Sequence, residues 1–154
     1  MGSLMEIAEV IRPENVARNL AAPSKTRLLR TLSAIAGKAL GADADAIFAA
    51  LENREKLGST GIGAGIAIPH APVAGLTVPY GFIATLAKPI EFEAIDDAPV
   101  DIVCLLLTPL SGESDSLSLL SRIARQLRSP EVAKAIRSAP DEAHIHAGIT
   151  GRHR

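Results

Sequence analysis

Residues 100–108 form a run in which nearly every side chain is apolar and strand-forming residues are frequent. Because a strand alternates its side chains between two faces, such a run needs apolar cover on both faces of its sheet. It therefore predicts a central strand enclosed between two layers of structure. Cys104 lies inside this run and is expected to be a buried structural thiol.

Two helices are expected before this strand. Ser24 is suited to cap the first helix, whose apolar residues recur at helical spacing until Gly41 ends it. Asp43 or Asp45 can cap the second helix, which stops near Gly58. The first third of the chain is therefore predicted to be mainly helical.

The middle of the chain is predicted to contain the strands. Residues 65–70 and 80–86 are expected to be strands of the same sheet as 100–108. Residues 89–92 are expected to be a loop or a short edge strand.

The last third of the chain is predicted to be helical again. One helix is indicated by an apolar stripe formed by Leu117, Leu120, Ile123, Ala124 and Leu127. Pro130 suits the first turn of a second helix, and residues 141–149 are expected to form a last short one. Helices, then strands, then helices predict an α/β or α+β fold with a two-faced sheet.

Length and composition limit the other possibilities. The 154 residues predict one domain over 5–150, with 1–4 as an added segment before a natural start and 151–154 as a tail. Sixteen basic residues against seventeen acidic ones leave no electrostatic footprint for nucleic acid. No apolar run reaches the roughly 20 residues that a membrane span needs. The lack of a targeting segment and the single cysteine fit a cytoplasmic location.

The most unusual segment is the glycine-rich stretch of residues 58–70, GSTGIGAGIAIPH. It does not match a dinucleotide-binding fingerprint, because Ile66 stands where the third glycine is required. It does not match a P-loop, because Ala64 occupies the position of the lysine. The simplest structural interpretation is a tight turn, for which glycine is well suited.

His70 adds a chemical interpretation to this segment. It follows Pro69 at the end of a short apolar strand, where a histidine can also be incidental. Arg54 precedes the segment, and Ser59 and Thr60 lie within it. A guanidinium, two hydroxyls and backbone N–H groups could together bind an oxyanion beside the imidazole. A hydrolase using Ser59 and His70 is disfavoured, because the nucleophile-elbow pattern is missing.

These residues resemble the IIA component of the bacterial phosphoenolpyruvate-dependent phosphotransferase system. The similarity is to the mannitol/fructose class and, within it, to the nitrogen-regulatory branch. It is carried by residues 54–63 and 65–70, by 89–97 with 99–101, and by 117–127 followed by 130–132. It extends over residues 5–150, nearly the whole sequence.

The resemblance implies a mixed five-stranded sheet flanked by helices on both faces. It implies that His70 is the phosphorylated residue and Arg54 its active-site partner, with no cofactor and no metal in the transfer. The residues expected around the phosphate are Ser59, Thr60, Gly61, Gly63 and Ser116. The expected phosphate donor is a small histidine-phosphorylated carrier of the HPr type.

The resemblance also implies a transferase-type phosphocarrier with a mainly regulatory role. Regulated partners in this branch include potassium-transport systems and sensor kinases. Two alternatives stay open: a sugar-specific IIA that passes phosphate to a separate IIB protein, and a binding module without phosphotransfer.

One position departs from the family pattern. The family usually has a second histidine that opens the helix after the central strand, and here that position is Ser116. A serine can hydrogen-bond and can cap a helix, but it cannot titrate near neutral pH. His144 and His146 are expected to be exposed tail residues, which a helix would direct apart.

Overall fold

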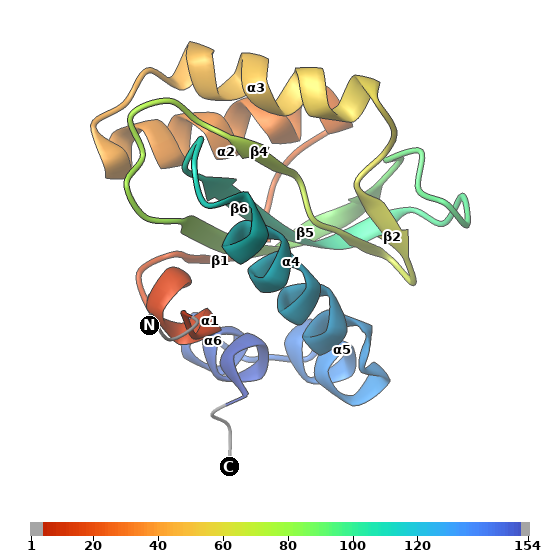
Figure 1. The fold of residues 1–154 in the computed structure, drawn as a ribbon. Helices are drawn as coiled ribbons and strands as arrows, with labels where there is room; N and C mark the ends of the chain where they lie inside the picture. Colours follow the sequence, from red (N-terminus) through yellow and green to blue (C-terminus); the bar gives the residue numbers. More distant parts are fainter. Residues whose placement is uncertain (1–4, 152–154) are drawn as a thin grey trace.

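The computed structural model describes residues 5–151, with the backbone alone at positions 113 and 114. The expectations for residues 1–4 and 152–154 therefore lie outside the described residues. Figure 1 shows a sheet through the middle of the molecule with helices above and below it. The predicted α/β architecture with a two-faced sheet is confirmed.

The sheet contains six strands within the described part of the chain. Their order is β1 (Val16–Leu20), β5 (Tyr80–Ile90), β6 (Val100–Thr108), β3 (Ile66–Ala67) and β2 (Gly61–Gly63), and β4 (His70–Pro72) also pairs with β6. β5 and β6 are antiparallel, whereas β3 and β4 both run parallel to β6. The central place predicted for residues 100–108 is confirmed. Residues 89–92 are expected to be a loop or a short edge strand, but the first two of them belong to β5, which continues through Ile90.

The sheet has six strands where the resemblance implies five, and the predicted strand 65–70 is divided into β3 and β4. After β3 the strand is interrupted at Ile68 and Pro69, and Pro69 has no N–H to donate to a neighbouring strand. His70 then rejoins the sheet as the first residue of β4, opposite Leu106 of β6. The break therefore places His70 at the beginning of a strand.

Helices cover both faces of the sheet (Figure 1). α2 (Lys25–Leu40) and α3 (Ala44–Lys56) lie on one face, and α1 (Ile7–Val10), α4 (Glu113–Arg128), α5 (Pro130–Arg137) and α6 (Glu142–Thr150) on the other. Alternate residues of β6 enter the two apolar clusters between these layers. Cys104 is completely buried, as predicted, and burial raises the pKa of its thiol to about 12. Within residues 5–151, no helix combines the length and the apolar character needed to cross a membrane.

The helix ends follow the sequence signals. Ser24 Oγ accepts a hydrogen bond from the N–H of Arg27 at 3.2 Å, and Gly41 ends α2 in the left-handed conformation. Asp43 caps α3, and Pro130 occupies the first turn of α5. These predicted boundaries are confirmed, whereas the short elements α1, β1 and β2 lie outside the predicted set.

Helix α4 begins earlier than the sequence predicts. Its N-cap is Gly112 and its first residue is Glu113, so Ser116 is already helical. The N–H of Ser116 donates to the carbonyl oxygen of Gly112 at 3.1 Å. The expectation that Ser116 opens and caps this helix is therefore wrong. Leu117 is 59% exposed, and Leu119 lies in the buried stripe instead.

The two histidines of α6 have different surroundings. His144 is exposed, as expected, and its Nδ1 lies 2.6 Å from Oδ1 of Asp141. His146 is partly buried, and its Nε2 donates to the carbonyl oxygen of Ile11 at 2.7 Å. The expectation of an exposed tail residue is wrong for His146, because α6 packs against the segment that follows α1.

Candidate active site

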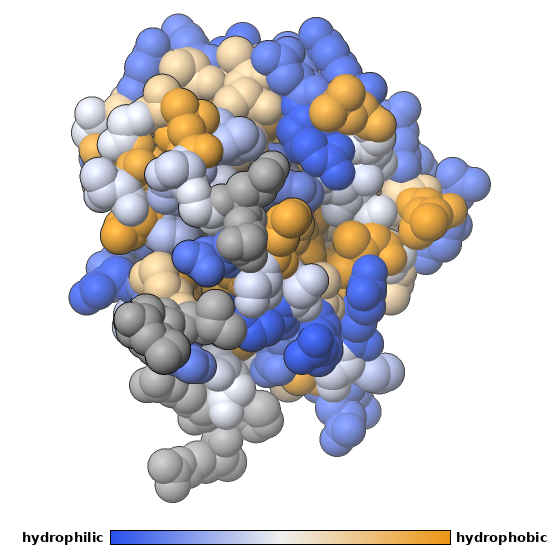
Figure 2. All heavy atoms as spheres, viewed as in Figure 1, coloured by the Kyte–Doolittle hydropathy of each residue, from blue (hydrophilic) through white to orange (hydrophobic). Residues whose placement is uncertain are grey.

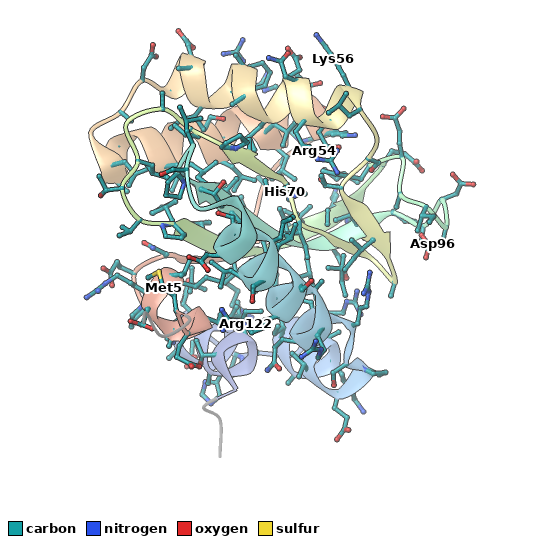
Figure 3. The ribbon with its side chains drawn as sticks, in the orientation of Figure 1. Met5, Arg54, Lys56, His70, Asp96 and Arg122 are labelled. Atoms are coloured by element: carbon teal, nitrogen blue, oxygen red, sulfur yellow. The ribbon has the colours of Figure 1, made fainter. Side chains whose placement is uncertain are left out.

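His70 lies in a cleft between the end of α3 and the face of α4. Figure 3 shows it between Arg54 and the ribbon of α4. The cleft is lined by residues that include His70, Arg54 of α3, Ser59 and Thr60 of the glycine-rich segment, and Leu120, Arg125 and Arg128 of α4. Because β4 pairs with the central strand β6, the sheet holds the backbone of His70. The residue is half-buried, and its side chain lines the cleft.

The ring of His70 has a defined tautomer. Its Nδ1 lies 2.8 Å from the carbonyl oxygen of Ile68, and a carbonyl can only accept a hydrogen bond. Nδ1 therefore carries the hydrogen, and Nε2 carries the free lone pair. Burial lowers the pKa of His70 from its ordinary value of 6.5. The bond to Ile68 opposes this shift, while the charge of Arg54 adds to it. The ring is therefore neutral and nucleophilic at neutral pH.

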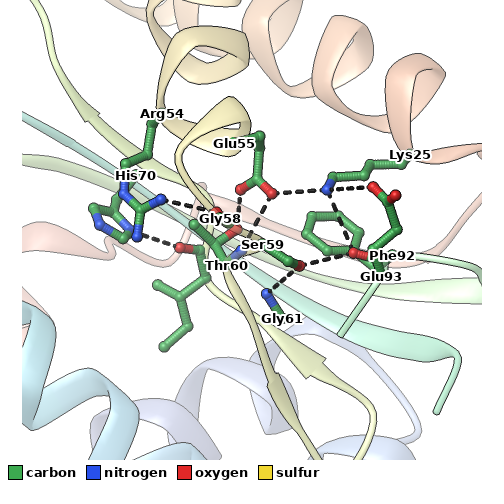
Figure 4. Close-up of polar contacts among 11 residues, drawn as sticks. Lys25, Arg54, Glu55, Gly58, Ser59, Thr60, Gly61, His70, Phe92 and Glu93 are labelled. Atoms are coloured by element: carbon green, nitrogen blue, oxygen red, sulfur yellow. Dashed lines mark hydrogen bonds and ion pairs between the residues drawn. The ribbon is translucent and has the colours of Figure 1, made fainter. Parts of the chain in front are cut away.

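Arg54 reaches the cleft from the last turn of α3. One of its terminal nitrogens, Nη1, donates to the carbonyl oxygen of Gly58 at 2.8 Å. This bond holds the guanidinium beside the ring of His70, as Figure 4 shows. A guanidinium has five N–H donors in a planar fork, so most remain for an anion. Arg54 and His70 therefore line one cleft, with N–H donors of Arg54 still available to an anion.

A buried carboxylate fixes the turn next to Arg54. Glu55 accepts hydrogen bonds from the backbone N–H of Thr60, at 3.1 Å, and from its hydroxyl. Lys25 of α2 completes the group, with its Nζ 2.8 Å from Glu55 Oε1. The Glu55 side chain is only 7% exposed and that of Lys25 18%. The arrangement ties the start of α2, the end of α3 and the turn into one unit (Figure 4).

Ser59 is also held by internal contacts. Its hydroxyl donates to the carbonyl oxygen of Phe92 at 2.8 Å and accepts from the N–H of Gly61 at 3.0 Å. Lys25 lies over the ring of Phe92, with its Nζ 4.6 Å from the ring centre. Ser59 and Thr60 do line the cleft of His70, but their hydroxyl hydrogens are donated elsewhere.

The glycine-rich segment forms a hairpin and not a ring of free N–H groups. The backbone N–H groups of Thr60, Gly61, Ala64 and Ile68 are all donated within the protein. Gly61 is required by space, because an added Cβ would lie 2.8 Å from Cβ of Ala94. Gly63 is required by its φ of +99°. Neither glycine is among the residues that line the cleft.

Two charged residues of the cleft lie outside the predicted site residues. Arg125 and Arg128 extend from α4 into the same cleft as Arg54 and His70. Their spacing of three residues puts them on one face of a helix. The sequence signal that could have identified them is this pair of arginines, three residues apart, in the helix that carries the apolar stripe.

A second hollow lies on the other side of His70. Ser116, Leu117 and Leu110 line it together with His70. Ser116 therefore lines the same hollow as His70, although it does not cap the helix. Leu110 is 68% exposed and Leu117 59%. Figure 2 shows apolar and hydrophilic groups side by side on this face of the molecule.

Comparison with known families gives a match over nearly the whole chain. The family model described as "Phosphoenolpyruvate-dependent sugar phosphotransferase system, EIIA 2" matches residues 9–151. This interval contains both walls of the cleft around His70.

Individual proteins give a consistent result. A nitrogen regulatory protein of Bradyrhizobium diazoefficiens is 41% identical over 143 residues, 93% of this chain and 94% of the relative. One of Klebsiella oxytoca is 36% identical over 149 residues, 96% of this chain and 92% of the relative. The crystal structure of the nitrogen regulatory protein IIA-Ntr of Neisseria meningitidis superposes with a TM-score of 0.89 at 28% identity, covering 94% of this chain and 99% of that one.

Proposed function

The chain belongs to the EIIA 2 family of the phosphoenolpyruvate-dependent sugar phosphotransferase system, and we propose that it is a phosphocarrier whose Nε2 of His70 accepts a phosphoryl group. One observation carries this assignment of the reacting atom. The bond from Nδ1 to the carbonyl of Ile68 leaves Nε2 as the ring nitrogen with a lone pair, in a cleft next to Arg54.

In the proposed transfer, the lone pair of His70 Nε2 forms the new bond to phosphorus. The bond between phosphorus and the donor's ring nitrogen breaks, and its electron pair stays on the donor. The hydrogen on Nδ1 need not move, because the Ile68 carbonyl accepts it before and after the reaction. The same carbonyl stabilises the positive charge that the ring acquires as it becomes phosphorylated.

Arg54 is proposed to bind the oxygens of the phosphoryl group. Its fork can make two parallel hydrogen bonds to phosphate oxygens, which a lysine cannot do. The contact with Gly58 positions this fork before the donor arrives. Catalysis of phosphoryl transfer depends mainly on such positioning and on neutralisation of charge.

The remaining predicted site residues have different proposed roles. Ser59 and Thr60 shape the turn that holds Arg54, because their hydroxyls already donate within the protein. Gly61 and Gly63 permit the hairpin behind the cleft. Ser116 lines the hollow next to His70 and supplies a small polar side chain on the donor's side.

The proposed donor is an HPr-type carrier, and the proposed role is regulatory. The similarity to nitrogen regulatory proteins over almost the whole chain supports this branch. Partners then bind one phosphorylation state in preference to the other, because the phosphate adds roughly −1.5 to −2 charges at neutral pH. Potassium-transport systems and sensor kinases are the proposed regulated classes.

The test is phosphorylation in a reconstituted system. The chain is incubated with phosphoenolpyruvate, enzyme I and the HPr-type carrier, and its intact mass is measured. Gain of a single phosphoryl group supports the phosphocarrier function, and no gain supports a pure binding module. Onward transfer to a separate IIB protein would instead indicate a sugar-specific IIA.

A further inference from the structure

The part of the cleft formed by the end of α4 is strongly cationic. Arg125 and Arg128 line the cleft together with Arg54, and none of the described residues that line it is acidic. Neither Arg125 nor Arg128 forms an ion pair with any side chain that the structure describes. Both side chains belong to exposed residues. Glu6 lines a neighbouring hollow with Arg125 but forms no ion pair with it, so the cleft surface presents a net positive charge.

These arginines lie along the last turn of α4, at the end of the cleft that the helix forms beside His70. Leu120 lines both hollows that contain His70. Arg125 and Arg128 follow it by five and eight residues, which is about 7.5 and 12 Å along the helix axis. A phosphoryl group bonded to a ring nitrogen spans only a few ångströms. The far end of this cationic stripe therefore faces whatever molecule covers the cleft during transfer.

The opposite side of His70 has the contrary character. Leu110 and Leu117, both exposed by more than half, line the hollow on that side. A covering molecule thus meets apolar side chains on one side of His70 and arginines on the other. Arginine and apolar side chains are both enriched in protein interfaces.

We propose that Arg125 and Arg128 form the docking surface for an acidic patch on the protein that donates phosphate to His70. This inference rests on the phosphocarrier function proposed above. The donor carries carboxylates on the side of its reactive histidine that meets α4, and an apolar patch on the side that meets Leu110 and Leu117. Each guanidinium can bind a carboxylate through two parallel hydrogen bonds. Complementary charge of this kind determines partner choice and the rate of encounter.

Binding of the unphosphorylated HPr-type carrier tests the proposal directly. The Arg125→Glu/Arg128→Glu variant is compared with Arg27→Glu/Lys38→Glu, which changes the net charge equally on exposed sites of α2. Lys38 lies in the last turn of its helix, as Arg125 and Arg128 do, so it controls for the effect of charge on a helix end. Affinity is measured by calorimetry or by NMR titration.

The α4 variant is expected to bind the carrier roughly tenfold more weakly or worse, and the α2 variant to bind like the wild type. The wild-type affinity should fall as salt is added, and the α4 variant should lose this dependence. Unchanged binding by the α4 variant would overturn the proposal, as would an equal loss in the α2 variant.

Phosphoramidate, a small donor with no docking surface, separates docking from action on the phosphate. The α4 variant is expected to lose at least roughly tenfold more rate with the carrier than with phosphoramidate. Equal losses with both donors would assign the arginines to the phosphoryl group and overturn the docking role. If His70 accepts phosphate from neither donor, the phosphocarrier function fails, while the binding measurement still decides the docking surface.

Discussion

Nδ1 of His70 lies 2.8 Å from the carbonyl oxygen of Ile68, two residues earlier in the same chain. The contact forms where the strand is interrupted, at Ile68 and Pro69. It fixes both the orientation of the ring and the nitrogen that carries the hydrogen. A short irregularity between two strands thereby leaves Nε2, the atom proposed to accept phosphate, with the free lone pair.

The protonation of His70 gives a first prediction. Burial, aided by the charge of Arg54, lowers the pKa of His70 below its ordinary value. A proton on Nε2 would remove the reacting lone pair. Phosphate transfer should therefore persist at pH values where an ordinary imidazole, with a pKa of about 6.5, is protonated, and fall only below the lowered pKa. NMR titration of His70 beside the pH–rate profile checks this, and a pKa at or above 6.5 contradicts it.

The same shift affects the pH dependence of folding. As pH falls through the ordinary histidine pKa, the unfolded chain takes up a proton that the native ring still rejects. The free energy of unfolding therefore decreases between that value and the lowered pKa, and His70 adds no further change below it. His70→Gln should remove this slope from denaturation curves collected across the interval. An identical slope in the variant would show that other groups cause it.

Arg54→Lys tests whether the planar fork matters beyond its charge. We expect transfer to slow by about tenfold or more, because lysine keeps the charge but loses the paired hydrogen bonds and the contact with Gly58. Arg27→Lys on exposed α2 is the matched control and should transfer at the wild-type rate. The measurement is the single-turnover rate from the phosphorylated carrier. Equal rates for Arg54→Lys and the wild type would exclude the proposed role.

The Lys25–Glu55 pair is predicted to stabilise the turn. Glu55→Gln leaves the ammonium of Lys25 without its closest buried partner and should lower the free energy of unfolding by about 3 kcal/mol. Glu93→Gln changes the exposed end of the same group, at 3.4 Å from Lys25, and should have a much smaller effect. Chemical denaturation distinguishes the two variants. Similar losses would mean that burial of Glu55 contributes nothing.

Ser116 is predicted to matter for transfer and not for folding. Ser116→Ala should change the free energy of unfolding by less than about 0.5 kcal/mol, because Gly112 is the N-cap of α4. Ser24→Ala, which removes a real cap, should cost about 1 kcal/mol. Ser116→His should raise the transfer rate or alter its pH dependence between about pH 6 and 8. If both stay unchanged, Ser116 does not correspond to the family's second histidine.

Strong local signals made most of the fold predictable. The apolar residues 100–108 and the caps at Ser24 and Asp43 depend on nearby residues alone, and all three predictions are confirmed. The division of residues 65–70 into β3 and β4 depends on pairing with β6, which no local pattern reports. The start of α4 was missed because Gly112 caps it without a side-chain hydrogen bond.

The site was predictable only in part, for the same reason. His70 and Arg54 stand in a continuous motif, and the structure does bring them together. Ser59 and Thr60 could be expected to donate hydrogen bonds to a phosphate. Their hydroxyls instead donate to Phe92 and Glu55, residues whose positions depend on the fold. Arg125 and Arg128 come from a helix that is distant in sequence, so only the packing of α4 against the sheet reveals that they share the cleft of His70.

The most direct test of the account is to identify the phosphorylated atom by NMR. The chain is phosphorylated by the HPr-type carrier, and the ring nitrogens of His70 are assigned through their long-range couplings to the ring hydrogens. We predict a single phosphoryl group on Nε2, with the hydrogen still on Nδ1, and none on a folded His70→Ala variant. Phosphate on Nδ1, or phosphate that persists on His70→Ala, would contradict the account.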